Sequence, residues 1–402
     1  MKNFYFIGIL IILLFCQNIL LAQSPVYNNR ILVVGGGGAR GAWGAGFAKH
    51  LTEKYKGSYK TVYGTSTGSL MAPLIVLNDF VTLKTAYTSV TQRSIFNVNP
   101  FNRKTGELKK VPAFFRLLIG KKTFGESKNL RKLIDQFVSL PQYQQIRNSP
   151  DSLHFTVTVV DLKTGKPDYK SSNKIADFEQ MKNWMWASGN EPLFMSYYPK
   201  KGPQAYVDGG VLENVPLKEA LRFAIKNANI QDIDVIINKP IHPLVDTTFR
   251  KRGILQGLTR LIDLWSIEIR DDDTLIPQLV ALAVNNQLTR QLVAAVHKTN
   301  GETISLSKPD SINIHLYYFP PELFTKLNQK ELLLDKKRMT EMWEAGEAGK
   351  EDPNPKFDIS SLINPQILNS TSHLMNLRAS EKADQPITIP KALLENFLNG
   401  LK

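Results

Sequence analysis

Short apolar runs alternate along this chain with segments in which apolar side chains recur every three or four positions. Runs bounded by polar residues are typical of buried strands, and the longer spacing is typical of a helix face. Strands are predicted at residues 31–34, 59–63, 154–160, 206–207, 233–237 and 312–319, and helices at residues 43–55, 69–77, 129–138, 217–225 and 253–296. Strands that alternate with helices predict an α/β fold with a mainly parallel central sheet flanked by helices.

A separate apolar segment, residues 4–15, follows Lys2 at the N-terminus. It is shorter than the ~20 apolar residues that a membrane-spanning helix needs. With the small residue Ala22 behind it, the pattern is typical of a signal peptide over residues 1–22. We therefore expect export to the periplasm, the outer envelope or the medium. A retained signal anchor is the alternative, and the bulky Phe15 argues against lipidation of Cys16.

Cys16 is the only cysteine among the 402 residues. Cleavage after Ala22 would remove it, and the mature chain could then form no disulfide, no thiolate metal site and no cysteine nucleophile. The hydrophobic content of 43% is enough for a large core and excludes a wholly disordered chain.

The pentapeptide 64–68 connects a predicted strand to a predicted helix and carries Ser66 between Gly64 and Gly68. A serine on such a turn is the nucleophile elbow of hydrolases, and the glycines are needed because Cβ atoms would collide where the chain reverses. The pentapeptide alone is also compatible with an ordinary structural turn. Its place between a strand and a helix favours a nucleophilic Ser66.

A run of glycines, residues 35–38, follows the first predicted strand and continues into Ala39, Arg40 and Gly41. It fits the dinucleotide pattern G-x-G-x-x-G, but that pattern also requires an acidic residue at the end of the second strand, and none is present there. The alternative is an oxyanion hole, because consecutive glycines let backbone N–H groups at a helix N-terminus point into one cavity. The Arg40 guanidinium could orient this loop, bind a phosphate or form a surface salt bridge.

A hydrolytic serine needs a base, and none of the six histidines stands in a recognisable motif. Asp208 is the better candidate, because it ends a predicted strand and is followed by Gly209 and Gly210, which permit close backbone approach. A carboxylate within hydrogen-bond reach of the serine and partly withdrawn from water can act as a general base. Standing alone, Asp-Gly-Gly is simply a turn signal.

Together, these segments resemble the patatin-like phospholipase family. The matching motifs are residues 35–41, residues 64–68, Asp208-Gly209-Gly210-Val211 with Asn214 and Pro216, and Ala187-Ser188 with Pro192. The resemblance covers residues 31 to about 217. Gly35 departs from it, since many members of the family have an aspartate before the glycines.

The resemblance implies a three-layer patatin-like fold and hydrolysis of acyl esters by a Ser-Asp dyad without histidine. Ser66 would be the nucleophile, Asp208 the general base, and Gly36, Gly37 and Gly38 the oxyanion hole. The residues expected to support the motifs are Arg40, Gly41, Gly64, Gly68, Gly209 and Gly210. The substrate would be a lipid or phospholipid, and the arrangement requires no metal and no cofactor.

Four regions follow from these observations. They are a signal peptide at residues 1–22, a catalytic core at residues 31–217, a mostly helical part at residues 218–345 that completes the α/β domain, and a polar tail at residues 346–402. A lipid acyltransferase or a non-catalytic lipid-binding envelope protein would share this scaffold. The presence of both Ser66 and Asp208 favours the hydrolase over the non-catalytic protein, whereas an acyltransferase would share every one of these motifs.

The chain has 50 Lys+Arg against 36 Asp+Glu, a net charge of +14, which favours contact with an anionic surface. Residues 93–132 are strongly basic and include Phe96, Phe101, Phe114, Phe115 and the apolar residues 117–119. This pattern suits peripheral contact with anionic phospholipid. It also suits phenylalanines that pack into the core beneath a basic face. Nucleic acid would attract the same charges, but a signal peptide argues against that partner.

If residues 1–22 are removed on export, the mature chain begins at Gln23. Sequencing the N-terminus of exported protein measures this directly. An intact chain that keeps Met1 and stays in the inner membrane would instead establish the signal anchor.

Overall fold

A central sheet organises the computed structural model, which describes residues 26–227, 229–240, 269, 273, 312–323 and 334–351. The strands are β1 (Tyr27–Val34), β2 (Ser58–Thr65), β3 (His154–Asp161), β4 (Lys166–Ser171), β5 (Tyr206–Asp208), β6 (Asp232–Ile237) and β7 (Asn313–Tyr318). Their order is β4-β3-β2-β1-β6-β7, with β5 also paired to β3. Neighbours from β3 to β7 run parallel, whereas β4 and β5 run antiparallel to β3. The mixed α/β fold with a mostly parallel sheet is confirmed.

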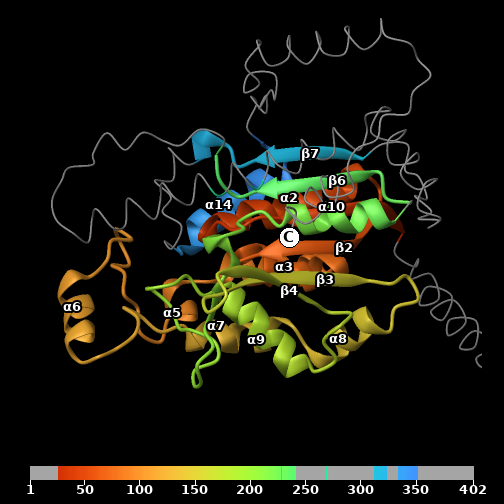
Figure 1. The fold of residues 1–402 in the computed structure, drawn as a ribbon. Helices are drawn as coiled ribbons and strands as arrows, with labels where there is room; N and C mark the ends of the chain where they lie inside the picture. Colours follow the sequence, from red (N-terminus) through yellow and green to blue (C-terminus); the bar gives the residue numbers. More distant parts are fainter. Residues whose placement is uncertain are drawn as a thin grey trace, which may run out of the picture.

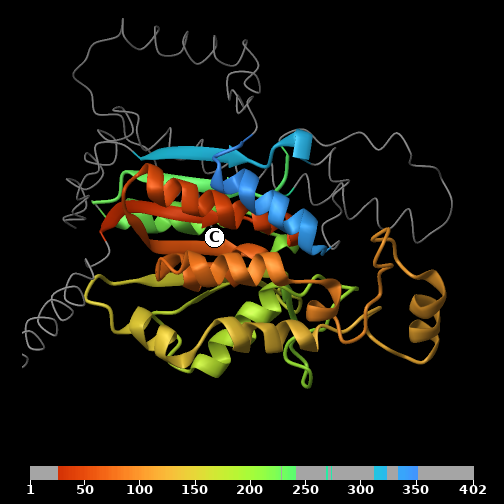
Figure 2. The same cartoon turned by 180° about the vertical axis from the view of Figure 1, so that it is seen from behind.

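Apolar side chains on both faces of the strands explain why the sheet is enclosed between helices. In β1, Leu32 and Val34 belong to one buried cluster, and Ile31 and Val33 belong to another. The first face is covered by α2 (Gly41–Lys54), α3 (Thr67–Val76) and α14 (Lys336–Glu347), and the second by α10 (Leu217–Lys226), as Figures 1 and 2 show. Continuous apolar runs are expected of strands that are buried on both faces.

The described residues form six further α-helices, most of them on the β3–β4 side of the sheet (Figure 1). They are α4 (Phe80–Ser89), α5 (Gln92–Ile95), α6 (Lys110–Leu118), α7 (Lys128–Phe137), α8 (Leu140–Arg147) and α9 (Phe178–Ser188). Of these, only α7 was predicted, because its apolar positions keep a clear helical spacing. Among the described residues, no helix is both long and apolar enough to cross a membrane.

Helix α14 was not predicted, and the expected tail boundary at residue 346 falls inside it. Gly346 lies directly against α2: a Cβ there would stand 2.1 Å from the Trp43 carbonyl oxygen. The Trp43 indole N–H donates to the Lys350 carbonyl at 2.7 Å. The chain therefore stays packed beyond residue 346. The predicted signal peptide, residues 352–402 and the predicted helix at 253–296, apart from Ile269 and Asp273, lie outside the described residues.

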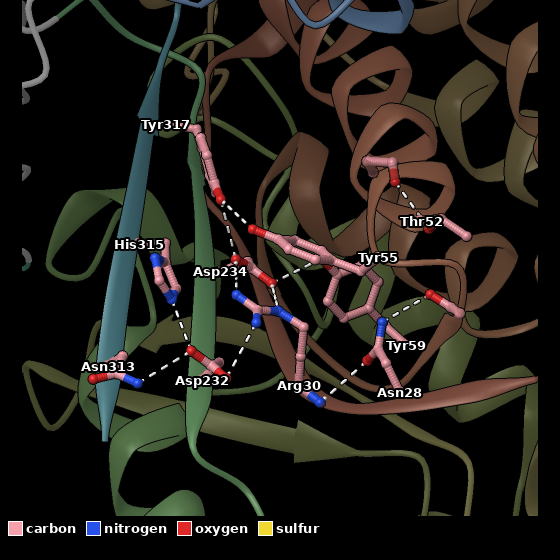
Figure 3. Close-up of polar contacts among 12 residues, drawn as sticks. Asn28, Arg30, Thr52, Tyr55, Tyr59, Asp232, Asp234, Asn313, His315 and Tyr317 are labelled. Atoms are coloured by element: carbon pink, nitrogen blue, oxygen red, sulfur yellow. Dashed lines mark hydrogen bonds and ion pairs between the residues drawn. The ribbon is translucent and has the colours of Figure 1, made fainter. Parts of the chain in front are cut away.

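A buried ion pair ties the amino-terminal ends of the strands together (Figure 3). The Arg30 guanidinium on β1 donates to both carboxylate oxygens of the fully buried Asp234 on β6, at 2.5 and 2.7 Å. Tyr59 and Tyr317 donate to the same carboxylate at 2.9 and 3.3 Å. Burial opposes the charge on Arg30, but hydrogen bonding and attraction to Asp234 outweigh it and raise its pKa.

Replacing Arg30 with methionine should destabilise the fold strongly, because Asp234 would remain buried without a cation. Breaking a buried pair in this way typically costs about 3–5 kcal/mol, whereas replacing both partners by apolar residues recovers much of the loss. We expect the free energy of unfolding of Arg30→Met, measured in urea, to be about 3–5 kcal/mol lower than that of the wild type. The double variant Arg30→Met/Asp234→Leu should lose less.

The matched control is the partly exposed pair Lys60–Asp151, whose charged atoms are 3.7 Å apart. Lys60→Met should cost at most about 1 kcal/mol. Equal losses in the two single variants would show that the buried pair has no special role.

Candidate active site

Ser66 occupies a sharp turn between β2 and α3, as the elbow motif predicts. Its backbone has φ 54° and ψ −123°, a conformation that costs a non-glycine residue energy and that is found at functional sites. The turn closes because Gly64 and Gly68 lack side chains: a Cβ on Gly64 would lie 2.5 Å from the Gly68 backbone. A Cβ on Gly68 would lie 2.1 Å from the Val34 carbonyl oxygen. Both predicted supporting glycines are therefore required by contact.

Hydrogen bonds hold this strained turn in place. The Ser66 N–H donates to the hydroxyl of Ser188 at 3.0 Å, and that hydroxyl donates to the Thr158 carbonyl on β3 at 2.7 Å. The Ser69 hydroxyl donates to the Ser66 carbonyl at 2.7 Å. Ser188 is completely buried at the end of α9, so it joins the elbow, a helix and the sheet at one point.

The sheet register brings Asp208 to the same place. Strand β2 pairs with one edge of β3 as far as Thr65, which lies opposite Thr158. At the next residue of β3, Val159, strand β5 takes over with Asp208 opposite it. Strands β2 and β5 therefore meet end to end on β3, where Thr65 and Asp208 occupy successive positions. Ser66 follows Thr65 directly.

The Asp208 side chain is 7% exposed and is oriented by its own turn. One carboxylate oxygen accepts the Gly210 N–H at 2.8 Å, and the Asp208 N–H donates to the Asn190 carbonyl at 3.0 Å. Gly209 is needed for close approach, since a Cβ there would lie 2.6 Å from the Thr158 carbonyl oxygen. Close packing therefore requires Gly209, whereas Gly210 contributes its backbone N–H to the Asp208 carboxylate.

The glycine-rich loop lies beside the elbow, at the carboxyl ends of β1 and β6. In parallel sheets this edge is where ligands bind. The Gly36 N–H donates to the Asn214 carbonyl at 3.0 Å, so this predicted oxyanion donor is engaged within the protein. Gly37 precedes η1 (Gly38–Arg40), and the first amides of a helix have no intrahelical acceptor. Gly37 and Gly38 both line the cavity that contains Ser66.

Arg40 is a buried residue that holds this loop. Its side chain is 5% exposed and donates to the Asn238 carbonyl at 2.8 Å, while the Asn238 amide donates to the Gly35 carbonyl at 2.9 Å. The hydrogen bond to Asn238 fits the first of the three roles considered for Arg40, orientation of the loop. Gly41 lies against the elbow, because a Cβ there would be 2.2 Å from the Thr67 hydroxyl.

A cavity of about 430 Å³ contains both catalytic candidates in its wall. The polar side chains and glycines of its lining include Ser66, Asp208, Gly37, Gly38, Asn214 and Lys239. Much of the remaining lining is apolar, and α3, α4 and α7 contribute to it Leu70, Leu74, Leu83, Tyr87, Leu130, Leu133, Ile134 and Phe137. An apolar cavity with a few convergent polar groups is the usual form of a small-ligand site.

None of the three described histidines lies in this cavity wall. His154 begins β3, at the opposite end of that strand from the residues that pair with β5, and its burial lowers its pKa. His315 hydrogen-bonds to Asp232 at 2.8 Å among the strand starts (Figure 3). His50 lies on α2 against Gly349. His242, His297 and His373 lie outside the described residues.

A buried acid, Glu213, lies between the turns that carry Ser66 and Asp208. Its carbonyl accepts the Thr65 hydroxyl at 3.2 Å, and its N–H donates to the Gly209 carbonyl at 2.8 Å. The Tyr169 hydroxyl donates to one carboxyl oxygen, and the other has no hydrogen-bond partner among the described residues. Burial raises the pKa of the Glu213 carboxyl to about 7. The neutral acid therefore fits this position best.

Several residues that support the site were not assigned these roles from the sequence. Ser188 and Asn214 belong to quoted motifs, but only the structure shows that they hold the elbow and the glycine loop. Asn190 and Asn238 belong to no recognised motif. Asn190 lies just beyond α9 and Asn238 just beyond β6, where an amide side chain favours local hydrogen bonding, and this is the one signal that the sequence offers.

Comparison with known proteins gives three results. Residues 32–221 match the family model described as patatin-like phospholipase. This range contains the glycine loop, the elbow and Asp208. A crystal structure of VipD from Legionella pneumophila is similar at 13% sequence identity, covering 80% of this chain and 68% of that chain with a TM-score of 0.34. No curated protein gave a significant match.

The pKa of Glu213 predicts a pH dependence of stability. In the unfolded chain this carboxyl loses its proton near its ordinary pKa of 4.5, whereas the folded protein keeps it up to about pH 7. The stability that the neutral acid contributes is therefore complete below pH 4.5 and is lost as the pH rises through 7. Between about pH 5 and 8, the wild type should lose roughly 1–3 kcal/mol relative to Glu213→Gln in urea unfolding. Parallel profiles for the two proteins would contradict a neutral Glu213.

Proposed function

We propose that the patatin-like region makes this chain a serine lipid acyl hydrolase, which cleaves acyl esters of lipids or phospholipids through a Ser66–Asp208 dyad. The observation that carries the proposal is the meeting of β2 and β5 on β3, which places both residues in the wall of one apolar cavity. The family match at residues 32–221 supports a lipid substrate.

The first half of the proposed reaction acylates Ser66. Its hydroxyl oxygen attacks the ester carbonyl carbon while the Asp208 carboxylate takes the hydroxyl proton. The N–H groups of Gly37 and Gly38 stabilise the oxyanion, which benefits from the N-terminus of η1 and α2. When the tetrahedral intermediate collapses, the alcohol leaves with the proton from Asp208 and the acyl group stays on Ser66.

The second half releases the acid. Asp208 takes a proton from water, the resulting nucleophile attacks the acyl-enzyme, and Ser66 leaves with that proton as the free carboxylic acid forms. During both halves, the apolar side chains of α3, α4 and α7 would cover the acyl chain, since burial of apolar surface favours binding. The turn at Gly210 keeps the Asp208 carboxylate oriented throughout.

We also propose export of the chain, which rests on the apolar segment 4–15 and Ala22. Activity in the envelope or outside the cell would bring the enzyme to membrane lipid without a transport step.

The dyad is tested by Ser66→Ala and Asp208→Asn. Loss of a general base usually lowers the rate about 10²–10⁴-fold, and loss of the nucleophile should cost at least as much. Both variants should lose hydrolysis of a short-chain nitrophenyl ester and of phospholipid to this extent. Hydrolysis of phospholipid is measured as fatty acid release by mass spectrometry. A fluorophosphonate probe should label the wild type and fail to label Ser66→Ala.

The control Asp151→Asn changes an exposed aspartate at the start of the β3 region and should keep full activity. Single replacements of the six histidines should also leave most of the activity. A histidine as indispensable as Ser66, together with a nearly active Asp208→Asn, would establish a histidine-containing triad and exclude the dyad.

A further inference from the structure

The segment between α5 and α7 leaves the body of the protein and returns to almost the same point. Backbone hydrogen bonds join its two ends. The N–H groups of Asn97 and Val98 donate to the Glu126 carbonyl at 3.1 and 3.3 Å, and the Glu126 N–H donates to the Val98 carbonyl at 3.0 Å. Between these ends, α6 stands apart from the sheet and its covering helices in both views (Figures 1 and 2). We refer to residues 97–126 as the α6 excursion.

Helix α6 exposes apolar side chains that a globular domain normally buries. Phe114, Phe115 and Leu118 are 61%, 59% and 67% exposed, and Val111, Leu117 and Ile119 are also more than half exposed. Within this helix, only Ala113 is buried. An exposed group of large apolar side chains usually marks an interaction surface. The phenylalanines expected in the core thus divide into two sets, because Phe96 and Phe101 are buried whereas Phe114 and Phe115 are not.

Positively charged residues flank α6 along the chain. Lys110, Lys121 and Lys122 are exposed and form no ion pair with any residue of the described chain. Two other cations have internal tasks: Lys109 donates to the Asn99 carbonyl at 3.1 Å, and Arg116 binds Glu126 at 3.2 Å. The surface therefore combines apolar side chains with unpaired lysines, which matches the headgroups and acyl region of an anionic membrane.

The base of the α6 excursion is attached to the wall of the catalytic cavity. Phe101 and Phe124 each contact the ring of Phe194, with ring centroids 5.1 and 5.9 Å apart. The Phe124 N–H donates to the Leu193 carbonyl at 2.7 Å. Leu193 and Met195, on either side of Phe194, line the cavity that contains Ser66. Contact made by α6 is thus anchored beside the site where the lipid would react.

We infer that α6 docks the protein on a membrane surface rich in anionic lipid, with Phe114, Phe115 and Leu118 inserted among the acyl chains and the lysines at the headgroups. The inference rests on the proposed function, because it names the surface from which the hydrolase takes its substrate. A second copy of this chain fits the surface less well: a symmetric contact through α6 would bring the same lysines face to face.

Binding is measured with the full chain carrying Ser66→Ala, so that vesicles stay intact. The probes are vesicles of phosphatidylcholine alone and of phosphatidylcholine mixed with phosphatidylserine, with co-sedimentation as the readout. The triple variant Phe114→Ser/Phe115→Ser/Leu118→Ser should bind the mixed vesicles about tenfold or more weakly. It lacks the three apolar side chains whose transfer from water into the acyl region favours binding. The triple variant Lys110→Gln/Lys121→Gln/Lys122→Gln should bind the mixed vesicles on the order of tenfold to hundredfold more weakly. Added salt should weaken the binding of the parent chain, in which α6 is unchanged.

The matched control is Val81→Ser/Leu140→Ser, which removes two exposed apolar side chains on α4 and α8. In Figure 1, α8 lies on the opposite side of the protein from α6. This control should bind vesicles as tightly as the parent. With Ser66 restored, the α6 variants should hydrolyse the soluble nitrophenyl ester normally and lose activity only on vesicles. If the α6 variants keep full activity on vesicles as well as on the soluble ester, the inference is overturned.

A depth measurement distinguishes insertion from simple charge attraction. Leu118→Cys, in a Cys16→Ser background, is labelled with a fluorophore that responds to polarity. Its emission should shift to the blue on mixed vesicles, and a label at Leu140→Cys should not shift. An unshifted Leu118 label, or α6 variants that change only the oligomeric state in size-exclusion chromatography, would overturn membrane docking. Complete absence of ester hydrolysis in the wild type would contradict the proposed function but not the vesicle binding.

Discussion

The candidate site depends on one constraint, the shared edge of β3. Strand β2 uses that edge as far as Thr158, and β5 uses it from Val159 onward in the opposite direction. Hydrogen-bond register leaves little freedom, since a slip of one residue would turn every side chain to the other face of the sheet. Two segments separated by more than half of the described chain are thus fixed against each other by backbone pairing, before any side chain contributes.

The strained elbow can persist because its surroundings are rigid. An unfavourable backbone conformation survives only where neighbouring structure determines it. Here Ser188 connects the Ser66 amide to β3, and Gly64 and Gly68 fit directly against backbone atoms. At the other end of the sheet, the Arg30–Asp234 pair joins β1 to β6. The site therefore stands on a sheet whose two ends are both held by specific polar contacts.

Sequence patterns predicted the parts of this structure that depend on local chemistry. The apolar runs located five parallel strands and the antiparallel β5, and the glycines around Ser66 and Asp208 indicated turns that only small residues can make. The patterns missed several short helices around the sheet and also β4 and α14. The packing of these two depends on distant partners: β4 is half-buried and follows β3, and α14 fits α2 through Gly46 and Gly346. They also left the role of residues 93–132 open, because burial of Phe101 and exposure of Phe114 are decided by the path of the chain. No local pattern showed that Gly36 would donate its N–H to Asn214.

The closed base of the α6 excursion has a consequence for how such a protein can change. Val98 and Glu126 are backbone partners, so the excursion begins and ends at adjacent points and crosses no strand of the sheet. Insertions and replacements are tolerated best at exposed places whose two ends lie close together. The length and side chains of this segment can therefore vary, or be exchanged for those of another protein, without moving β2, β3 or β5. Membrane preference and bond-breaking chemistry would then evolve as separate modules, each free to diverge while the other is conserved.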